Sequence, residues 1–284
     1  MTPFDYVISA RKVVRNSFTP EPGPVSYLKV PSTSTEPDPA HRANNKTERE
    51  NWIKEVRALA DGNLSELSVS PKGDVLVFVH GYNNDLKVIM NRQRQLASDL
   101  RAEGWKGLVV GFDWPSDDST LNYLEDRRDA SKVAIELVRG GVRVIATGQE
   151  QGCETNVHLI GHSTGAFVIM EALAHAEKDG DIFKADWRIG QVAFIGGDVG
   201  ASSLAADSQW GTPMFSRIMR LTNYANPFDS VLGVSNAKRL GVSPRVGRVG
   251  LPKDAHPKAV NVHCGDYFSQ IDPKKARFFG TFNH

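Results

Sequence analysis

A serine with a glycine two positions to either side is the first feature of this sequence that could do chemistry. Residues 161–165 are Gly-His-Ser-Thr-Gly, with Ser163 at the centre. An apolar run before them predicts a buried strand, and the segment after them predicts a helix. On such a sharp turn the serine backbone is strained, its hydroxyl is exposed, and the glycines permit close packing. An ordinary Ser-Gly turn is the alternative, but this context favours a nucleophile.

A second motif precedes the serine by about 80 residues and follows another apolar run. Residues 80–84 are His-Gly-Tyr-Asn-Asn. A serine nucleophile needs backbone N–H groups that bind the negative oxygen of a tetrahedral intermediate, one from the residue after the serine and one from a loop after an earlier strand. We therefore expect the N–H groups of Thr164 and Tyr82 to form an oxyanion hole. A common β-turn would also contain Gly and Asn, but two motifs in this order make that alternative weaker.

Together with Asp-Trp-Pro-Ser at 113–116 and Tyr-Leu-Glu-Asp-Arg at 123–127, these segments resemble the α/β-hydrolases, and in particular a bacterial family of hydrolases of unknown function. The resemblance covers about residues 24–284. It implies an α/β-hydrolase fold, with a mostly parallel central sheet and helices on both faces, and a triad of serine, acid and histidine. The family generally has Met where this chain has Thr164. Because that position contributes its backbone, we expect an altered pocket shape and an unchanged mechanism.

The pattern of the chain independently predicts an α/β architecture. Apolar runs alternate with helical segments, which is typical of a parallel sheet covered on both sides. We expect strands at 74–79, 108–112, 156–160, 189–195, 218–222 and 259–263, and helices at 48–60, 86–103, 123–138 and 164–176.

We expect one domain over residues 1–284. Residues 1–50 are predicted to be a proline-rich extension, in which only 25–30 alternates well enough to form a strand, at the edge of the sheet. Residues 199–217 contain Trp210, Pro213, Met214 and Phe215. This segment could form a cap or pocket wall over the site, or a short helix in the core, and the sequence leaves both open.

In this fold the acid of the triad follows the serine along the chain. Asp229 lies just past the strand expected at 218–222 and resembles the acid of the family. Asp198 follows the preceding strand and is the alternative, although it could equally cap a helix.

Three histidines remain candidates for the base. His284, the last residue of the sequence, is similar to a C-terminal histidine of the family. His263 ends the strand expected at 259–263, where a structural role is more common, and His256 precedes that strand. We expect His284 to be the base, with His263 and His256 as alternatives.

The overall charge excludes some partners. The 34 Lys and Arg residues nearly balance the 33 Asp and Glu residues, so no strong field would attract nucleic acid or an anionic membrane. The N-terminal segment lacks a signal-peptide pattern, and no apolar run approaches the roughly 18 residues of a membrane span. These features predict a cytoplasmic protein without nucleic-acid or membrane partners. The oligomeric state cannot be inferred.

A triad of this kind needs no metal or organic cofactor, so we expect none. The leading hypothesis is a serine hydrolase that cleaves small to medium acyl esters through an acyl-enzyme intermediate. The same residues could serve an amidase, a thioesterase, a lipase or an acyltransferase. A catalytically silent protein of the same fold that binds a ligand is the alternative of another class.

Overall fold

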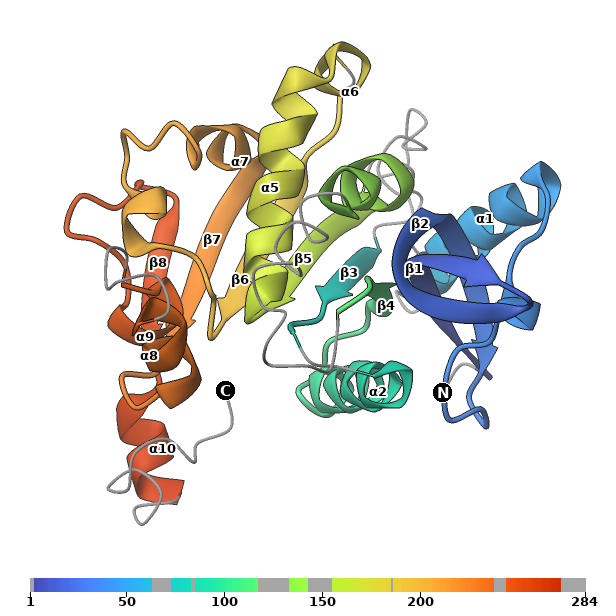
Figure 1. The fold of residues 1–284 in the computed structure, drawn as a ribbon, viewed down its shortest axis with the longest axis horizontal. Helices are drawn as coiled ribbons and strands as arrows, with labels where there is room; N and C mark the ends of the chain where they lie inside the picture. The colour runs from blue at the N-terminus through green and yellow to red at the C-terminus, as the bar shows by residue number, and fades with distance from the viewer. Residues whose placement is uncertain are drawn as a thin grey trace.

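The computed structural model describes residues 3–62, 73–82, 85–116, 133–142, 155–184, 186–237 and 244–271. These residues form an eight-stranded sheet with the strand order β2-β1-β4-β3-β5-β6-β7-β8 (Figure 1). Seven neighbouring strands are parallel, and only β2 is antiparallel to its neighbour β1. The strands are β1 (Phe4–Val14), β2 (Ser17–Pro31), β3 (Asp74–Val79), β4 (Leu108–Asp113), β5 (Asn156–His162), β6 (Ile189–Ile195), β7 (Ile218–Ala225) and β8 (Ala259–His263).

Helices lie between the parallel strands and after the last of them. They are α1 (Lys46–Gly62), α2 (Leu86–Ala102), α5 (Thr164–Lys178), α6 (Gly180–Lys184), α7 (Thr212–Arg217), α8 (Ser230–Ala237), α9 (Val246–Val249) and α10 (Gly265–Ile271). Further helical segments of the described residues are η1 (Pro39–His41), the π-helical η2 (Leu137–Val142) and η3 (Ala201–Leu204). Most of the helix expected at 123–138 lies outside the described residues. No helix in the described ranges combines the length and apolar character that crossing a membrane would need.

Alternating side chains of the central strands enter two different clusters. In β3, Val75, Val77 and Val79 pack in the main core, to which α1 and α5 contribute. Leu76 and Phe78 point the other way and pack with apolar residues of α2. Figure 1 accordingly shows α5 and α2 on opposite sides of the strands. The apolar runs predicted strands buried on both faces, and the expected α/β fold with a mostly parallel sheet is confirmed.

The N-terminal region differs from the expectation. The predicted strand at 25–30 lies in β2, at the edge of the sheet, but β2 begins already at Ser17 and a whole further strand, β1, precedes it. An edge strand has one set of N–H groups that needs no partner, so it accommodates the prolines that argued against a strand. Strand β1 is an interior strand that pairs with β4, and it supplies the fully buried Ile8 to the main core.

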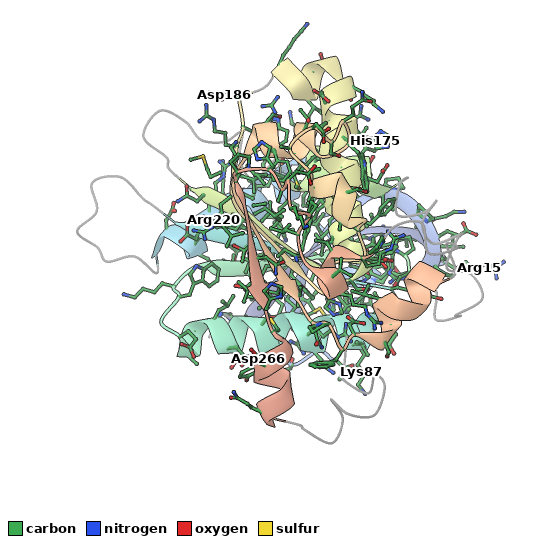
Figure 2. The ribbon with its side chains drawn as sticks, turned by 90° about the vertical axis from the view of Figure 1, so that its left-hand side faces the viewer. Arg15, Lys87, His175, Asp186, Arg220 and Asp266 are labelled. Carbon is green, nitrogen blue, oxygen red and sulfur yellow. The ribbon has the colours of Figure 1, made fainter. Side chains whose placement is uncertain are left out.

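Residues 199–217 contribute to the core. Pro213, Met214 and Phe215 lie in α7 and are buried, Met214 and Phe215 within the main cluster. The ring of Trp210 contacts that of Phe167, with centroids 5.6 Å apart. Other charged side chains are exposed, among them Lys87, Asp186, Arg220 and Asp266 (Figure 2).

Truncation of β1 tests its interior position. We expect Ile8→Ala to lower the free energy of unfolding by about 2–5 kcal/mol, because it removes a fully buried side chain from the main core. Val14→Ala, at the exposed end of the same strand, should cost less than about 1 kcal/mol. Urea unfolding of both variants measures the difference, and equal small losses would contradict an interior β1.

Candidate active site

The backbone at Ser163 has a conformation that L residues rarely adopt. Its φ is 54° and its ψ is −123°. Strand β5 ends just before it and α5 begins just after it. Three backbone hydrogen bonds hold the turn: the N–H of Ser163 donates to the carbonyl of Ile195, and the carbonyl of Ser163 accepts from the N–H groups of Ala166 and Asp198. The turn therefore has the strained strand-turn-helix geometry expected of a nucleophile, but Ser163 is only 6% exposed, so the expected exposure of its hydroxyl is not observed.

Glycines are required around this turn because other backbone approaches closely. A Cβ at Gly165 would lie 2.2 Å from the carbonyl oxygen of Val79, and one at Gly161 would lie 2.7 Å from the nitrogen of Ala166. A Cβ at Gly81 would lie 2.7 Å from the Cβ of Ser163 itself. The loop after β3 is thus packed directly against the serine, as the order of the two motifs led us to expect.

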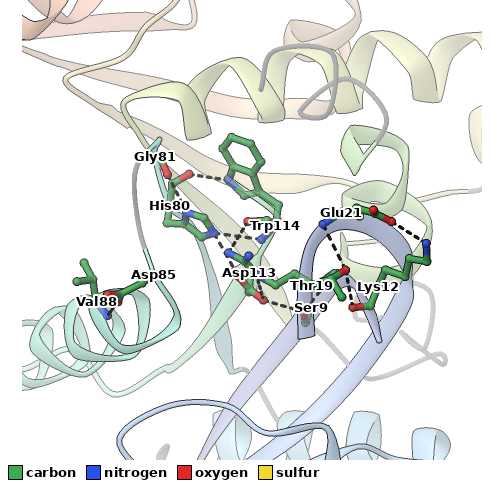
Figure 3. A network of polar contacts seen from close by, with 11 residues as sticks. Ser9, Lys12, Thr19, Glu21, His80, Gly81, Asp85, Val88, Asp113 and Trp114 are labelled. Carbon is green, nitrogen blue, oxygen red and sulfur yellow. Dashed lines mark hydrogen bonds and ion pairs between the residues drawn. The ribbon is translucent and has the colours of Figure 1, made fainter. Parts of the chain in front are cut away.

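His80 fixes the first part of that loop. Its side chain is fully buried, and its ring stacks on that of Trp114, with centroids 5.3 Å apart and planes 11° from parallel (Figure 3). The backbone N–H of Trp114 donates to Nε2 of His80 at 3.1 Å, and the indole N–H of Trp114 donates to the carbonyl of His80 at 2.8 Å. Since Nε2 accepts a hydrogen bond, the ring proton is assigned to Nδ1.

The same ring determines the direction of the next peptide. Nδ1 of His80 lies 2.8 Å from the carbonyl oxygen of Gly81 and donates to it. The peptide that contains this carbonyl also contains the N–H of Tyr82, and in a planar trans peptide the two groups point in opposite directions. Holding the Gly81 carbonyl toward His80 therefore turns the Tyr82 N–H away from His80. This hydrogen bond therefore contributes to the orientation of the expected oxyanion donor.

A buried carboxylate lies beneath His80. Asp113, the last residue of β4, is fully buried and receives a hydrogen bond from the Ser9 hydroxyl at 2.7 Å. Nε of Arg11 lies 2.9 and 3.1 Å from its two oxygens. His80 Nε2 is 3.5 Å away, but it already accepts from Trp114, so we take Arg11 and Ser9 as the partners of this carboxylate. Burial alone would raise the pKa of Asp113, but the Arg11 guanidinium holds it well below its usual range.

Sequence analysis did not identify this network. The Asp-Trp-Pro-Ser segment was noticed as part of the resemblance, but its partners Ser9 and Arg11 lie in a strand that was not predicted. A buried Arg in an unpredicted strand carries little signal by itself. The position of Asp113 at the end of a predicted buried strand could have indicated the network, because a buried carboxylate needs a partner of opposite charge.

The two candidate acids follow neighbouring strands at the carboxyl edge of the sheet. Asp198 follows β6 and is 2% exposed, and its carboxylate lies 3.4 Å from Nε of the buried Arg245. Asp229 follows β7, is also 2% exposed, and accepts the N–H of Leu232 at 2.9 Å at the start of α8. Because the carboxyl ends of parallel strands meet at one edge, both acids are on the side of the sheet that carries Ser163.

The three candidate bases differ in where they lie relative to Ser163. His284 lies outside the described residues. His263 ends β8 at the same carboxyl edge as Ser163, is exposed, and has its Nε2 3.0 Å from the side-chain nitrogen of Asn261. His256 precedes the amino end of β8 and stacks on Phe215, with centroids 4.0 Å apart. Burial, together with the nearby Lys258, lowers the pKa of His256. Its position at the other end of the strand is unfavourable for a base.

Among the residues with described positions, no group of three or more His, Cys, Asp and Glu side chains is arranged to hold a metal ion.

Comparison with known protein families places residues 57–261 in one of them. The matching family is described as alpha/beta hydrolase of unknown function (DUF900). The comparison with curated proteins gave no match.

Several solved structures resemble the chain at low identity. Esterase B from Lactobacillus rhamnosis, inhibited by a C6-C4 SN3 compound, is 14% identical with a TM-score of 0.34. That match covers 67% of this chain and 65% of the esterase, slightly less than two thirds of its length. A dienelactone hydrolase-like promiscuous phosphotriesterase, P91 from metagenomic libraries, is 16% identical with a TM-score of 0.33, over 70% of this chain and 72% of that one.

The Arg11–Asp113 pair generates a prediction about stability. We expect Asp113→Asn to lower the free energy of unfolding by about 3–5 kcal/mol at neutral pH, because it leaves the buried Arg11 guanidinium without a counter-charge. A carboxylate with a depressed folded-state pKa contributes stability that is complete above the unfolded pKa of about 3.9 and is lost as the pH falls through the folded pKa. The difference from the wild type should therefore narrow below about pH 4.

Urea unfolding at neutral pH and near pH 3 measures both effects. Asp5→Asn is the matched control, because Asp5 forms a more exposed ion pair with Arg94 at 2.8 Å. We expect it to cost about 1 kcal/mol or less. A loss for Asp113→Asn no larger than for Asp5→Asn would show that the buried pair is unimportant.

Proposed function

The chain belongs to the family of alpha/beta hydrolases of unknown function, and on this premise we propose that it is a serine hydrolase of carboxylic esters with Ser163 as its nucleophile. The observation that carries the proposal is the backbone of Ser163, with a φ of 54° between β5 and α5. This conformation costs free energy, and strain of this kind is found where a side chain must be presented for function. A type II′ turn has similar angles at its first central position, but that position is usually Gly, so a serine there is unusual and supports the proposal.

The proposed reaction proceeds in two steps. The Ser163 hydroxyl loses its proton to a histidine as its oxygen attacks the ester carbonyl, and the carbonyl electron pair moves onto the oxygen. Collapse of this tetrahedral intermediate expels the alcohol, which takes up the proton, and leaves an acyl-enzyme. Water then attacks the acyl carbon by the same route and releases the acid.

Two backbone N–H groups are proposed to stabilise the negative oxygen. The N–H of Thr164 is in the first turn of α5, where backbone N–H groups have no acceptor within the helix and the helix dipole favours a negative charge. The N–H of Tyr82 belongs to the peptide that His80 orients. The contact between Gly81 and Ser163 supports this assignment, because it brings the loop to the serine.

We propose Asp229 as the acid of the triad. Asp198 is buried beside the Arg245 guanidinium, so its charge is already compensated within the protein. Its backbone N–H also donates to the carbonyl of Ser163, which supports a structural function at the turn. Asp229 lies on the loop after β7, where its carboxylate accepts a backbone N–H at the start of α8. Such an anchored carboxylate could orient an imidazole.

For the base we propose His284, on its similarity to the family's C-terminal histidine. His263 is the alternative that the geometry favours next, because it ends β8 on the side of the sheet that carries Ser163. His256 is the weakest candidate, since it precedes the amino end of β8.

Exposed apolar side chains beside Asp229 support an apolar acyl or alcohol group in the substrate. Phe228, the residue before it, and Val231, two residues after it, are 37% and 50% exposed. Amide, thioester and lipid substrates, or transfer to an acceptor other than water, would use the same residues. A silent ligand-binding protein is the alternative of another class.

Covalent labelling tests the nucleophile. We expect a fluorophosphonate to form one adduct at Ser163, located by mass spectrometry, and the protein to hydrolyse p-nitrophenyl esters with a preference among acyl chain lengths. Ser163→Ala should remove the adduct and lower kcat by at least about 1000-fold, because the attacking oxygen is lost.

The outcomes separate the alternatives. Undiminished turnover by Ser163→Ala would overturn the nucleophile assignment. Absence of both adduct and turnover in the wild type would favour the silent binding protein. Ser216→Ala is a matched control, because Ser216 lies in α7 and its hydroxyl donates to the carbonyl of Pro213.

Single substitutions distinguish the candidate acids and bases. We expect Asp229→Asn to lower kcat by about 10⁴-fold, as when a triad acid no longer holds its histidine in the correct tautomer. Asp198→Asn should chiefly affect stability. Of His284→Ala, His263→Ala and His256→Ala, only the first should lower kcat by several orders of magnitude, measured with the same ester. A larger kcat loss for Asp198→Asn or His263→Ala would transfer the assignment to that residue.

A further inference from the structure

We propose that Arg11, from the N-terminal hairpin of β1 and β2, is a positioning residue for the loop after β3, residues 80–82, which carries the proposed donor Tyr82 and is called the oxyanion loop below. Arg11 holds this loop in its reactive orientation. This inference rests on the proposed function. It adds a contribution from outside residues 57–261, where the family match lies. Arg11 contacts neither Ser163 nor Tyr82 in the proposal, and acts through residues at the ends of β3 and β4.

The Arg11 guanidinium contacts two successive residues at the end of β4. Its Nε donates to both carboxylate oxygens of Asp113, at 2.9 and 3.1 Å, and its Nη2 donates to the carbonyl of Trp114 at 3.1 Å. Arg11 is 7% exposed and Asp113 is fully buried. A planar guanidinium can make these bonds together, whereas a Lys ammonium is a point charge without this fork. The chain from Asp113 to Trp114 is therefore clamped at two points.

Trp114 passes this constraint to the oxyanion loop. Its two N–H groups bond the Nε2 and the carbonyl of His80, and its ring stacks on that of His80 (Figure 3). His80 in turn bonds the carbonyl of Gly81 and thereby directs the N–H of Tyr82. Each link is a hydrogen bond between buried groups, where losing a partner is expensive and alternative orientations are few.

The course of β1 is consistent with a specific function for Arg11. The pairing of β1 with β2 changes register between Ser9 and Arg11 and again between Arg11 and Val13. Such irregularities re-aim a side chain, and they are common beside active sites. On the other side of β1 the pairing with β4 places Ser9 opposite Asp113. The strand thus departs from regular pairing at the residue that reaches the end of β4.

Kinetics at a known concentration of active sites test the proposal. Titration with a fluorophosphonate gives the concentration of reactive Ser163. Hydrolysis of p-nitrophenyl acetate then gives KM and a kcat that is calculated per active site. Inhibition of that hydrolysis by 1,1,1-trifluoro-4-phenylbutan-2-one gives an inhibition constant for the ketone. The ketone adds to the serine: a bond forms from Oγ to the carbonyl carbon, the π pair becomes the oxyanion, and the hydroxyl proton goes to the base. Its affinity therefore reports on the oxyanion hole.

We expect Arg11→Met to lower kcat per active site by about 10- to 100-fold and to leave KM within about threefold of the wild-type value. The inhibition constant of the ketone should rise by a factor similar to the loss of kcat. For Arg11→Lys we expect a smaller loss of kcat and a smaller rise of the inhibition constant than for Arg11→Met. A merely structural loss would lower the number of titrated sites and leave kcat per site and the inhibition constant unchanged. Lys12→Met is the matched control, because Lys12 is the next residue of β1 and pairs with Glu21 at the surface (Figure 3).

Values for Arg11→Met within twofold of those for Lys12→Met would overturn the inference. If Arg11→Met does not fold, Arg11→Lys and Ser9→Ala decide the question: losses of kcat and ketone affinity in the same direction support it, and wild-type values overturn it. A wild-type protein without adduct or turnover would overturn the proposed function and this inference together. An active wild type with an unaffected Arg11→Met would overturn the inference alone.

Discussion

The strained turn at Ser163 is the constraint on which the surrounding structure depends. A residue with a Cβ at a φ of 54° has an unfavourable backbone conformation, typically by about 1–3 kcal/mol, and it persists only if neighbouring segments over-determine it. Here β6, the start of α5 and the segment after β6 each bond its backbone. The loop after β3 packs against it with no room for a side chain at Gly81. The neighbouring strand β6, the start of α5 and the glycine at position 81 therefore all help to hold Ser163 in this conformation.

Two buried ion pairs lie close to this turn, and both fix backbone segments that meet there. Arg11 bonds Asp113 and the carbonyl of Trp114, and Trp114 bonds His80 at the start of the loop after β3. Asp198, which pairs with Arg245, donates its backbone N–H to the Ser163 carbonyl. Burying two charges costs much of what their attraction returns, so such pairs contribute little net stability. Their effect is better understood as geometric, because a paired charge in a dry interior has few alternative positions.

The sequence could predict the parts of the structure that follow from apolar burial. Runs such as 74–79 and 189–195 coincide with β3 and β6 because both faces of these strands are covered. Strand β1 was missed because Ser9 and Arg11 interrupt its apolar pattern, and only their distant partner Asp113 explains why polar side chains are buried there. The serine and its loop were predictable because local motifs encode them. Asp229 was preferred over Asp198 from the sequence already, and the proximity of Arg245 to Asp198, which no local pattern reveals, adds a structural reason for that proposal.

The interior position of β1 also has a consequence for the order of folding. Its hairpin with β2 needs only residues 4–31, but its other side pairs with β4, and Ser9 is 104 residues from Asp113. Until β4 is synthesised, one edge of β1 remains unpaired and open to association with other chains. Contacts of such long sequence separation form slowly, because a long loop must be closed first. We therefore expect the side of β1 that pairs with β4 to be covered later in folding than the side that pairs with β2.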